Sequence, residues 1–152
     1  MASVLKVVQW SDSYSLGLPE IDDQHKTLID LMNDLWAAIA ANAPIEDNQK
    51  ILLRLEQYTV AHFGAEETMM RSMDYPDFDA HLAAHQGFIK RLQAEGERLS
   101  KGEKLNLDIL HFLRDWLVNH ILVNDKAYAA YLAAANKPTG FLGRFFSRFM
   151  HA

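Results

Sequence analysis

The sequence predicts an all-α fold, an up-down-up-down antiparallel four-helix bundle with an N-terminal arm and a short C-terminal helical extension. Four segments repeat apolar residues about every 3.6 positions, which is the period of amphipathic helices, and none keeps the alternation of a β-strand. The links between these segments are short, and short links between long helices favour antiparallel neighbours.

The first predicted helix begins at Pro19, because proline fits the first turn of a helix. Glu20 and the aspartates after it complement the positive end of the helix dipole. Residues three and four positions apart form its inward face, which consists of Ile21, His25, Leu28, Met32, Leu35 and Ile39. One member of this apolar face is a histidine.

The other three predicted helices also have histidine on their inward faces. These faces are Ile51, Leu55, Tyr58, His62, Glu66 and Met69 or Met70; Phe78, His81 or Leu82, His85, Phe88 or Ile89, Leu92 and Leu99; and Ile109, Leu113, Trp116, His120 and Val123. The third helix is expected to begin near Pro76, and the three links are expected at 41–47, 73–77 and 100–106. A further short helix is predicted over residues 126–135, before Pro138 and Gly140.

The length of 152 residues fits one domain, and the composition is that of a globular protein, with 49% hydrophobic and 23% charged residues. No apolar run approaches the roughly 20 residues of a membrane-spanning helix, and the first residues lack the pattern of a secretory signal. We therefore expect a cytoplasmic protein.

The sequence contains no cysteine. This excludes disulfides, thiolate zinc sites, iron–sulfur clusters and cysteine nucleophiles, so a metal here must be bound by nitrogen and oxygen. The net charge of −5 gives no electrostatic reason to expect binding of nucleic acid.

The charge is uneven between two predicted parts, a bundle domain over residues 1–136 and a basic aromatic tail over residues 137–152. The tail has three basic residues and no acid, and its segment "FLGRFFSRFM" can form an amphipathic helix. Residues 138–152 are therefore a candidate for contact with an anionic membrane surface or a protein partner. The alternative is that they pack on their own bundle or on a neighbouring subunit.

Five histidines and two carboxylates form the candidate metal site: His25, His62, His81, His85, His120, Glu66 and Asp125. A single histidine on an apolar face is more often a hydrogen-bonded core residue, but five on four faces that must meet favour a metal. Residues four apart on a helix differ by about 40° in direction, so His62 and Glu66 can direct their ligand atoms at one point. His81 and His85 can do the same. Burying such groups unpartnered would cost several kcal/mol each, and a metal ion supplies the partner.

Seven ligands exceed the six positions of one octahedral ion, so the sequence indicates two ions. If both carboxylates bridge and an oxide or hydroxide also bridges, one of the remaining positions is open to a small diatomic ligand. Two six-coordinate ions favour iron or manganese over tetrahedral zinc, and the histidine-rich set favours iron.

Some residues near the site have open interpretations. His120 and Asp125 would lie about 140° apart on an ideal helix, so either the helix ends near residue 122 or it contains a local bulge. His111 is interpreted as a non-ligand, and Glu67 as a solvated surface acid, because each points away from the inward face. Gln24 either supports the site or is exposed.

These residues resemble the hemerythrin family, and within it the single-domain bacterial members. The matching elements are Trp10, "LPEIDDQH" ending at His25, "HFGAEE" with His62 and Glu66, "HLAAH" with His81 and His85, and "WLVNHILVND" with His120 and Asp125. The resemblance covers about residues 8 to 131, and this combination of spacings is highly specific.

The resemblance implies a four-helix bundle that binds dioxygen reversibly at a non-haem di-iron centre, for oxygen storage, transport or delivery. It implies one iron bound by His81, His85 and His120, a second bound by His25 and His62, and bridges from Glu66 and Asp125. The cofactors would be two iron ions joined by an oxide or hydroxide. Helical spacing suggests that the oxygen pocket is lined by Leu28, Leu113, Trp116 and Leu117, although ordinary core packing explains each of them equally well.

Two alternatives to an oxygen carrier stay open. A di-iron enzyme could reduce nitric oxide, peroxide or oxygen; against it, the site has few carboxylates, and no flavin or nicotinamide motif is present. An oxygen or iron sensor module would need an output, which only the tail could provide. The sequence favours a carrier that is not an enzyme.

Overall fold

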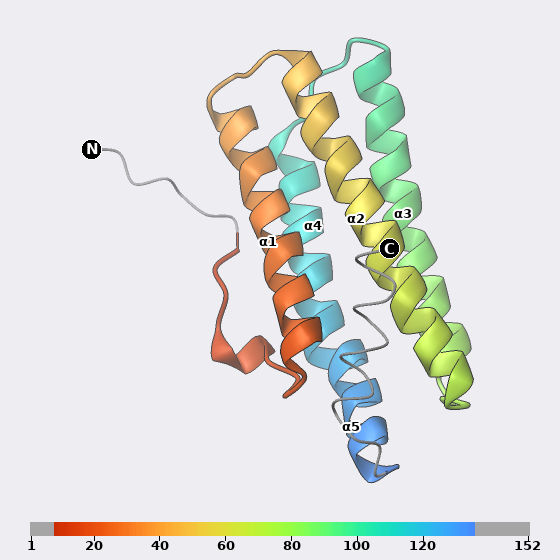
Figure 1. Cartoon of the computed structure of the whole chain (residues 1–152). Coiled ribbons are helices and arrows are strands. Elements are labelled where there is room, and N and C mark those ends of the chain that lie inside the picture. Colours follow the sequence, from red (N-terminus) through yellow and green to blue (C-terminus); the bar gives the residue numbers. More distant parts are fainter. Residues whose placement is uncertain (1–7, 136–152) are drawn as a thin grey trace.

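The computed structural model describes residues 8–135, and it confirms the predicted four-helix bundle. The four long helices are α1 (Pro19–Ala40), α2 (Ile45–Ser72), α3 (Phe78–Ser100) and α4 (Leu107–Asn119). They run alternately up and down, with α1 beside α4 and α2 beside α3, and α1 also contacts α2 (Figure 1). The four inward faces therefore meet along one axis.

Three short elements complete the described chain. A 3₁₀ turn, η1 (Asp12–Tyr14), precedes α1; a π-helical turn, η2 (His120–Asp125), follows α4 directly; and α5 (Lys126–Ala134) continues from it, close to the predicted 126–135 (Figure 1). In residues 8–135 no helix is long and apolar enough to cross a membrane. The predicted tail, 137–152, lies outside the described residues, so the boundary at residue 136 stays a prediction.

The link between α1 and α2 is shorter than the sequence predicts, whereas the link between α2 and α3 is the predicted 73–77. The second helix begins at Ile45, directly after Pro44, so Glu46 and Asp47 form its acidic first turn and do not belong to the link. The third helix begins at Phe78, after Pro76, because a turn is formed there by the Phe78 amide donating to the Tyr75 carbonyl.

Each of the three links contains one residue in the left-handed backbone region: Asn42, Asp74 and Gly102, with φ of 53°, 52° and 83°. Asparagine, aspartate and glycine tolerate this conformation best, because short polar side chains or a missing Cβ reduce the steric conflict. These residues reverse the chain within a few positions and so hold the helices antiparallel.

The N-terminal arm is attached to α1 by specific hydrogen bonds. The Val8 amide donates to the Asn33 side chain (3.2 Å), and the Asn33 amide group donates back to the Val8 carbonyl (2.9 Å). Lower on the helix, the Asp22 carboxylate accepts from the Ser15 hydroxyl (2.6 Å) and the Leu16 amide (2.9 Å). The arm is thus fixed along the outside of α1.

The core consists of two apolar clusters with a polar layer between them. The larger cluster fills the half of the bundle near the α1–α2 and α3–α4 links and includes Leu35, Leu55, Leu92, Leu99 and Ile109. The smaller one lies near α5 and comprises Leu18, Ile21, Ala65, Met69, Met70, Tyr75, Tyr128 and Leu132. On α1, His25 falls between Ile21 of the smaller cluster and Leu28 of the larger one, so the polar layer lies where the two clusters meet.

Truncation of Leu99 to alanine tests whether the larger cluster provides stability independently of the polar layer. Leu99 is 1% exposed and lies near the end of α3 away from its histidines. Leu99→Ala is expected to lower the free energy of unfolding by about 2–5 kcal/mol, because it removes buried methyl groups and leaves a cavity. Denaturant unfolding measures this change, and the variant should bind as much metal ion as the unmodified chain. Loss of metal binding would show that the larger cluster and the polar layer are not independent.

Candidate metal centre

The structure brings all seven predicted ligands together in one buried cluster. Each of the four helical segments contributes to it, and none of the seven side chains is more than 3% exposed. They are His25 from α1, His62 and Glu66 from α2, His81 and His85 from α3, and His120 and Asp125 from η2. Five imidazoles and two carboxylates thus share one site without access to bulk water.

Glu66 directs its two oxygens at different histidines. Its Oε1 lies 2.8 Å from Nε2 of His62 and 3.7 Å from Nε2 of His25. Its Oε2 lies 3.6 Å from Nε2 of His81 and 3.4 Å from Nε2 of His85. One carboxylate therefore spans a group of two histidines and a group on the opposite side.

Asp125 spans the same two groups. Its Oδ2 lies 3.1 Å from Nε2 of His25, whereas its Oδ1 lies 3.3 Å from Nε2 of His81 and 3.1 Å from Nε2 of His120. Glu66 thus presents one oxygen to His25 and His62 and the other to His81 and His85, whereas Asp125 presents one oxygen to His25 and the other to His81 and His120. This is the arrangement that two bridging carboxylates require.

The donor atoms form two sets that could each hold a metal ion, one of Glu66, His81, His85, His120 and Asp125, and one of His25, His62 and Glu66. In the first set, Nε2 of His85 and Nε2 of His120 lie 3.0 Å apart. Two nitrogens each about 2.1 Å from one ion, at a right angle, would be separated by about this distance. The spacing fits adjacent positions around one octahedral ion.

Unsatisfied polar atoms give an independent test of whether the cluster fits a metal. Four buried atoms of the cluster have no hydrogen-bond partner in the described residues: Nδ1 of His25, Oε2 of Glu66, Nε2 of His81 and Oδ1 of Asp125. Three of these four face the shared centre of the cluster. Because buried polar groups are nearly always paired, a cation between them is the partner that their chemistry lacks.

The π-helical turn explains the unusual spacing of His120 and Asp125. Of the two alternatives that the sequence left open, the structure has the local bulge, over His120–Asp125. In a π-turn the hydrogen bonds join residues five apart, so these two residues face the same way. A regular helix would direct Asp125 about 140° away from His120.

Electrostatics in the cluster favour protonated histidine when no metal ion is bound. Burial by itself lowers the pKa of His25 and of His81, but the adjacent carboxylates of Asp125 and Glu66 outweigh it and raise both pKa values to about 9. The pKa of His120 is lowered, because burial outweighs the attraction of Asp125. Burial would raise the pKa of both carboxyl groups, yet the surrounding histidines hold them below their ordinary values.

Two residues outside the predicted set are hydrogen-bonded to Nδ1 of a ligand histidine, the ring nitrogen on the side away from the two carboxylates. Gln24 is buried and its Oε1 is hydrogen-bonded to Nδ1 of His62, and Glu67 Oε2 lies 2.7 Å from Nδ1 of His85. The interpretation of Glu67 as a solvated surface acid is therefore wrong. Its direction on α2 is away from the bundle axis, but α3 lies close enough there for His85 to reach it. His111, interpreted as a non-ligand, is exposed.

The four predicted pocket residues lie in the larger apolar cluster or pack against it. Leu28, Leu113 and Leu117 are at most 2% exposed and belong to the larger apolar cluster. Trp116 is half-buried and stacks on the ring of His120, with centroids 4.3 Å apart and 14° between the planes. Their position agrees with an apolar cover, and their role toward oxygen stays a prediction.

Comparisons with known proteins identify the family. A family model described as the hemerythrin HHE cation binding domain matches residues 16–132, which is most of the chain. The chain belongs to the hemerythrin family. A bacteriohemerythrin of Stenotrophomonas maltophilia is 32% identical over 95% of this chain and 99% of its own length. A bacteriohemerythrin of Methylococcus capsulatus is 41% identical over 74% of this chain and 86% of its own.

Solved structures place the same fold around this hemerythrin. A crystal structure of wild-type hemerythrin is 37% identical and covers 81% of this chain and 95% of its own, with a TM-score of 0.75. A single-substitution variant gives a TM-score of 0.77 at 35% identity, over 83% of this chain and 97% of its own. These hemerythrins and the present chain therefore share the bundle fold.

The raised pKa values predict that metal binding to this hemerythrin is linked to proton release. Below about pH 9, His25 and His81 hold protons that an ion must displace, since only neutral imidazole binds a metal. The apparent affinity of the metal-free protein for Fe²⁺ should therefore increase as the pH rises toward about 9 and level off above it. Anaerobic equilibrium titrations at several pH values measure this dependence. An affinity independent of pH would contradict it.

Proposed function

We propose that this hemerythrin binds dioxygen reversibly at a non-haem di-iron centre and so stores, carries or delivers oxygen. The observation that supports this most directly is the pair of carboxylates, Glu66 and Asp125, that each face two histidine groups with separate oxygens. The family to which the chain belongs supports the same site.

In this proposal, His81, His85 and His120 would hold one iron and His25 with His62 would hold the other, with Glu66 and Asp125 shared between them. The protein would then supply five donors to the three-histidine side and four to the two-histidine side. The two-histidine side would therefore have more room for dioxygen.

When bound, two iron ions would supply the electrons that reversible binding of oxygen needs. The protein's own part is to limit what else can happen there. The site is enclosed between two apolar clusters, which keep bulk water and its protons away from the metal position. Exclusion of water prevents side reactions and favours release of the unchanged ligand.

Tyr128 closes the site on the side of the smaller cluster. It is 1% exposed, and its hydroxyl donates to Oε1 of Glu66 at 3.4 Å. Burial and the nearby carboxylates raise its pKa well above the ordinary value, so the phenol stays protonated. In our proposal, Tyr128 holds the bridging carboxylate of Glu66 in place and does not release its proton to the site.

We propose a carrier and not an enzyme. Five histidines and only two carboxylates face the centre, and neutral nitrogen donors stabilise highly oxidised iron less than carboxylates do. The names of the relatives, bacteriohemerythrin and the myohemerythrin of Theromyzon tessulatum, are those of hemerythrins and support the same choice.

An optical oxygen titration tests the proposal. Reduced, iron-loaded protein without air is expected to contain two irons per chain. It should gain a visible absorption band when oxygen is admitted and lose that band when oxygen is removed. Two irons with prompt, irreversible oxidation would contradict a carrier and would favour an enzyme or a sensor.

Replacement of His120 tests the ligand set against a matched control. His120→Ala removes a buried nitrogen from the three-histidine side and should bring the iron content below two per chain and abolish the reversible band. His111→Ala, on α4 directly before the π-helical turn and exposed, should retain both properties. Elemental analysis with the oxygen titration measures both variants. Full iron in His120→Ala would remove this residue from the set.

A further inference from the structure

Two of the proposed ligand histidines are hydrogen-bonded at Nδ1, and the partner is a different chemical group in each case. Nδ1 of His85 lies 2.7 Å from Oε2 of Glu67, and Nδ1 of His62 is hydrogen-bonded to Oε1 of Gln24. In both rings the Nδ1 edge meets this partner, while Nε2 faces the carboxylates of the cluster. Each contact joins two helices, α2 to α3 for Glu67 and α1 to α2 for Gln24.

The acceptor in each contact determines the tautomer of the ring. A carboxylate oxygen and an amide oxygen can only accept, so Nδ1 of each histidine must carry the hydrogen and donate it. The lone pair is then on Nε2, the atom that faces the cluster. Gln24 and Glu67 thus both prepare a histidine for metal binding.

The two acceptors differ in charge, however. Glu67 is a carboxylate that can bear a full negative charge, whereas Gln24 is a neutral amide. A charged acceptor forms a stronger hydrogen bond and draws the Nδ1 proton away from the ring, which makes Nε2 a stronger electron donor. His85 belongs to the three-histidine group and His62 to the two-histidine group. The difference in the donor strength of Nε2 is therefore a difference between the two metal positions.

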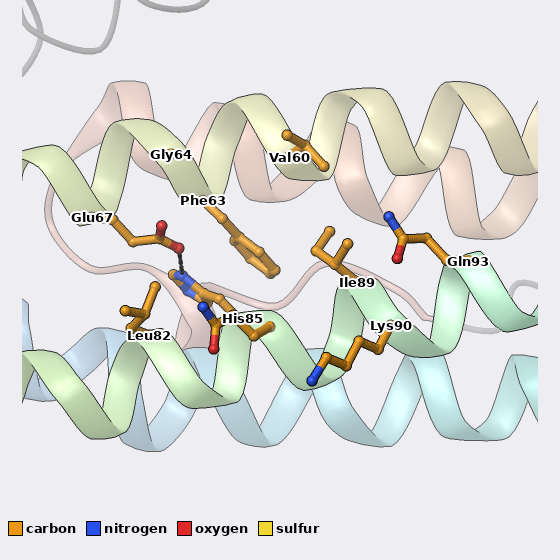
Figure 2. Close-up of a pocket in the computed structure, with 10 residues that line it drawn as sticks. Val60, Phe63, Gly64, Glu67, Leu82, His85, Ile89, Lys90 and Gln93 are labelled. Carbon is orange, nitrogen blue, oxygen red and sulfur yellow. Dashed lines mark hydrogen bonds and ion pairs between the residues drawn. The ribbon is translucent and has the colours of Figure 1, made fainter.

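Glu67 lies partly exposed beside the buried site. Its side chain is 23% exposed at the edge of a groove of about 490 Å³ between α2 and α3. Figure 2 shows Glu67 reaching from α2 to His85 across this groove, with Val60 and Ile89 farther along its walls. Partial contact with water lowers the cost of holding a carboxylate there.

The ring of His85 is also fixed in orientation. Phe63, one turn before Glu67 on α2, stacks on it with centroids 3.7 Å apart and 2° between the planes. Phe63 is 4% exposed and packs in the larger cluster. Because packing already sets the orientation of the ring, a change of charge at residue 67 alters the donor strength of Nε2 more than its position.

We propose that Glu67 and Gln24 are positioning residues that make the two metal positions electronically unequal. Glu67 strengthens His85 as a donor on the three-histidine side, and neutral Gln24 leaves His62 a weaker donor on the side that is open to oxygen. This inference rests on the ligand set of the proposed function. Its consequence is that the charge at residue 67 lowers the reduction potential of the three-histidine side, because strong donors favour the oxidised metal.

Isosteric charge exchange tests the proposal. Glu67→Gln keeps an acceptor for Nδ1 and removes the charge, and Gln24→Glu does the reverse at His62. Glu46→Gln, exposed in the first turn of α2, changes the net charge equally at a distance from the site. An anaerobic redox titration of the iron-loaded proteins should give a higher midpoint potential for Glu67→Gln, a lower one for Gln24→Glu, and an unchanged one for Glu46→Gln.

A second readout does not depend on iron or oxygen. In protein loaded with diamagnetic Zn²⁺, ¹H–¹⁵N NMR of the imidazoles should show a far-downfield Nδ1 proton for His85 that moves upfield in Glu67→Gln. Gln24→Glu should move the Nδ1 proton of His62 downfield. If Glu67→Gln matches Glu46→Gln in both measurements, Glu67 has only a structural role and the proposal fails. Loss of reversible oxygen binding with these shifts intact would overturn the proposed function alone.

Discussion

The structure depends on burying two carboxylates at the axis of a helical bundle. Glu66 and Asp125 are at most 1% exposed, and charges so far from water are stable only with closely placed partners. No single helix can supply enough of them, so histidines come from α1, α2, α3 and η2. This requirement fixes the axial register of every long helix, because a shift of one turn would withdraw a partner.

The apolar clusters on either side stabilise the bundle around this polar layer. The larger cluster holds the helices together without any contribution from the site, and the smaller one closes the end near α5. The same packing that stabilises the bundle also limits the access of water to the histidines. Stability and control of the chemistry therefore come from one arrangement, in which apolar layers enclose a polar one.

Helical periodicity is sufficient to predict the bundle and the clustering of the five histidines, because the inward faces of four amphipathic helices pack against one another in a common core. It could not decide between a helix end and a bulge at His120–Asp125, since both satisfy the spacing. It also misplaced Glu67, because direction on one helix says nothing about how closely the next helix approaches. Contacts between helices, such as those of Glu67 and Gln24, depend on packing distances that one sequence does not specify.

The π-helical turn lets one continuous helical stretch place both His120 and Asp125 inward without changing the packing on either side. Inserting a single residue into an uninterrupted helix and absorbing it in one wide turn leaves the residues beyond the turn facing as before. Tyr128 and Leu132 accordingly remain in the core past η2. The disturbance is confined to one turn, so Asp125 faces inward while the helix beyond it keeps its packing.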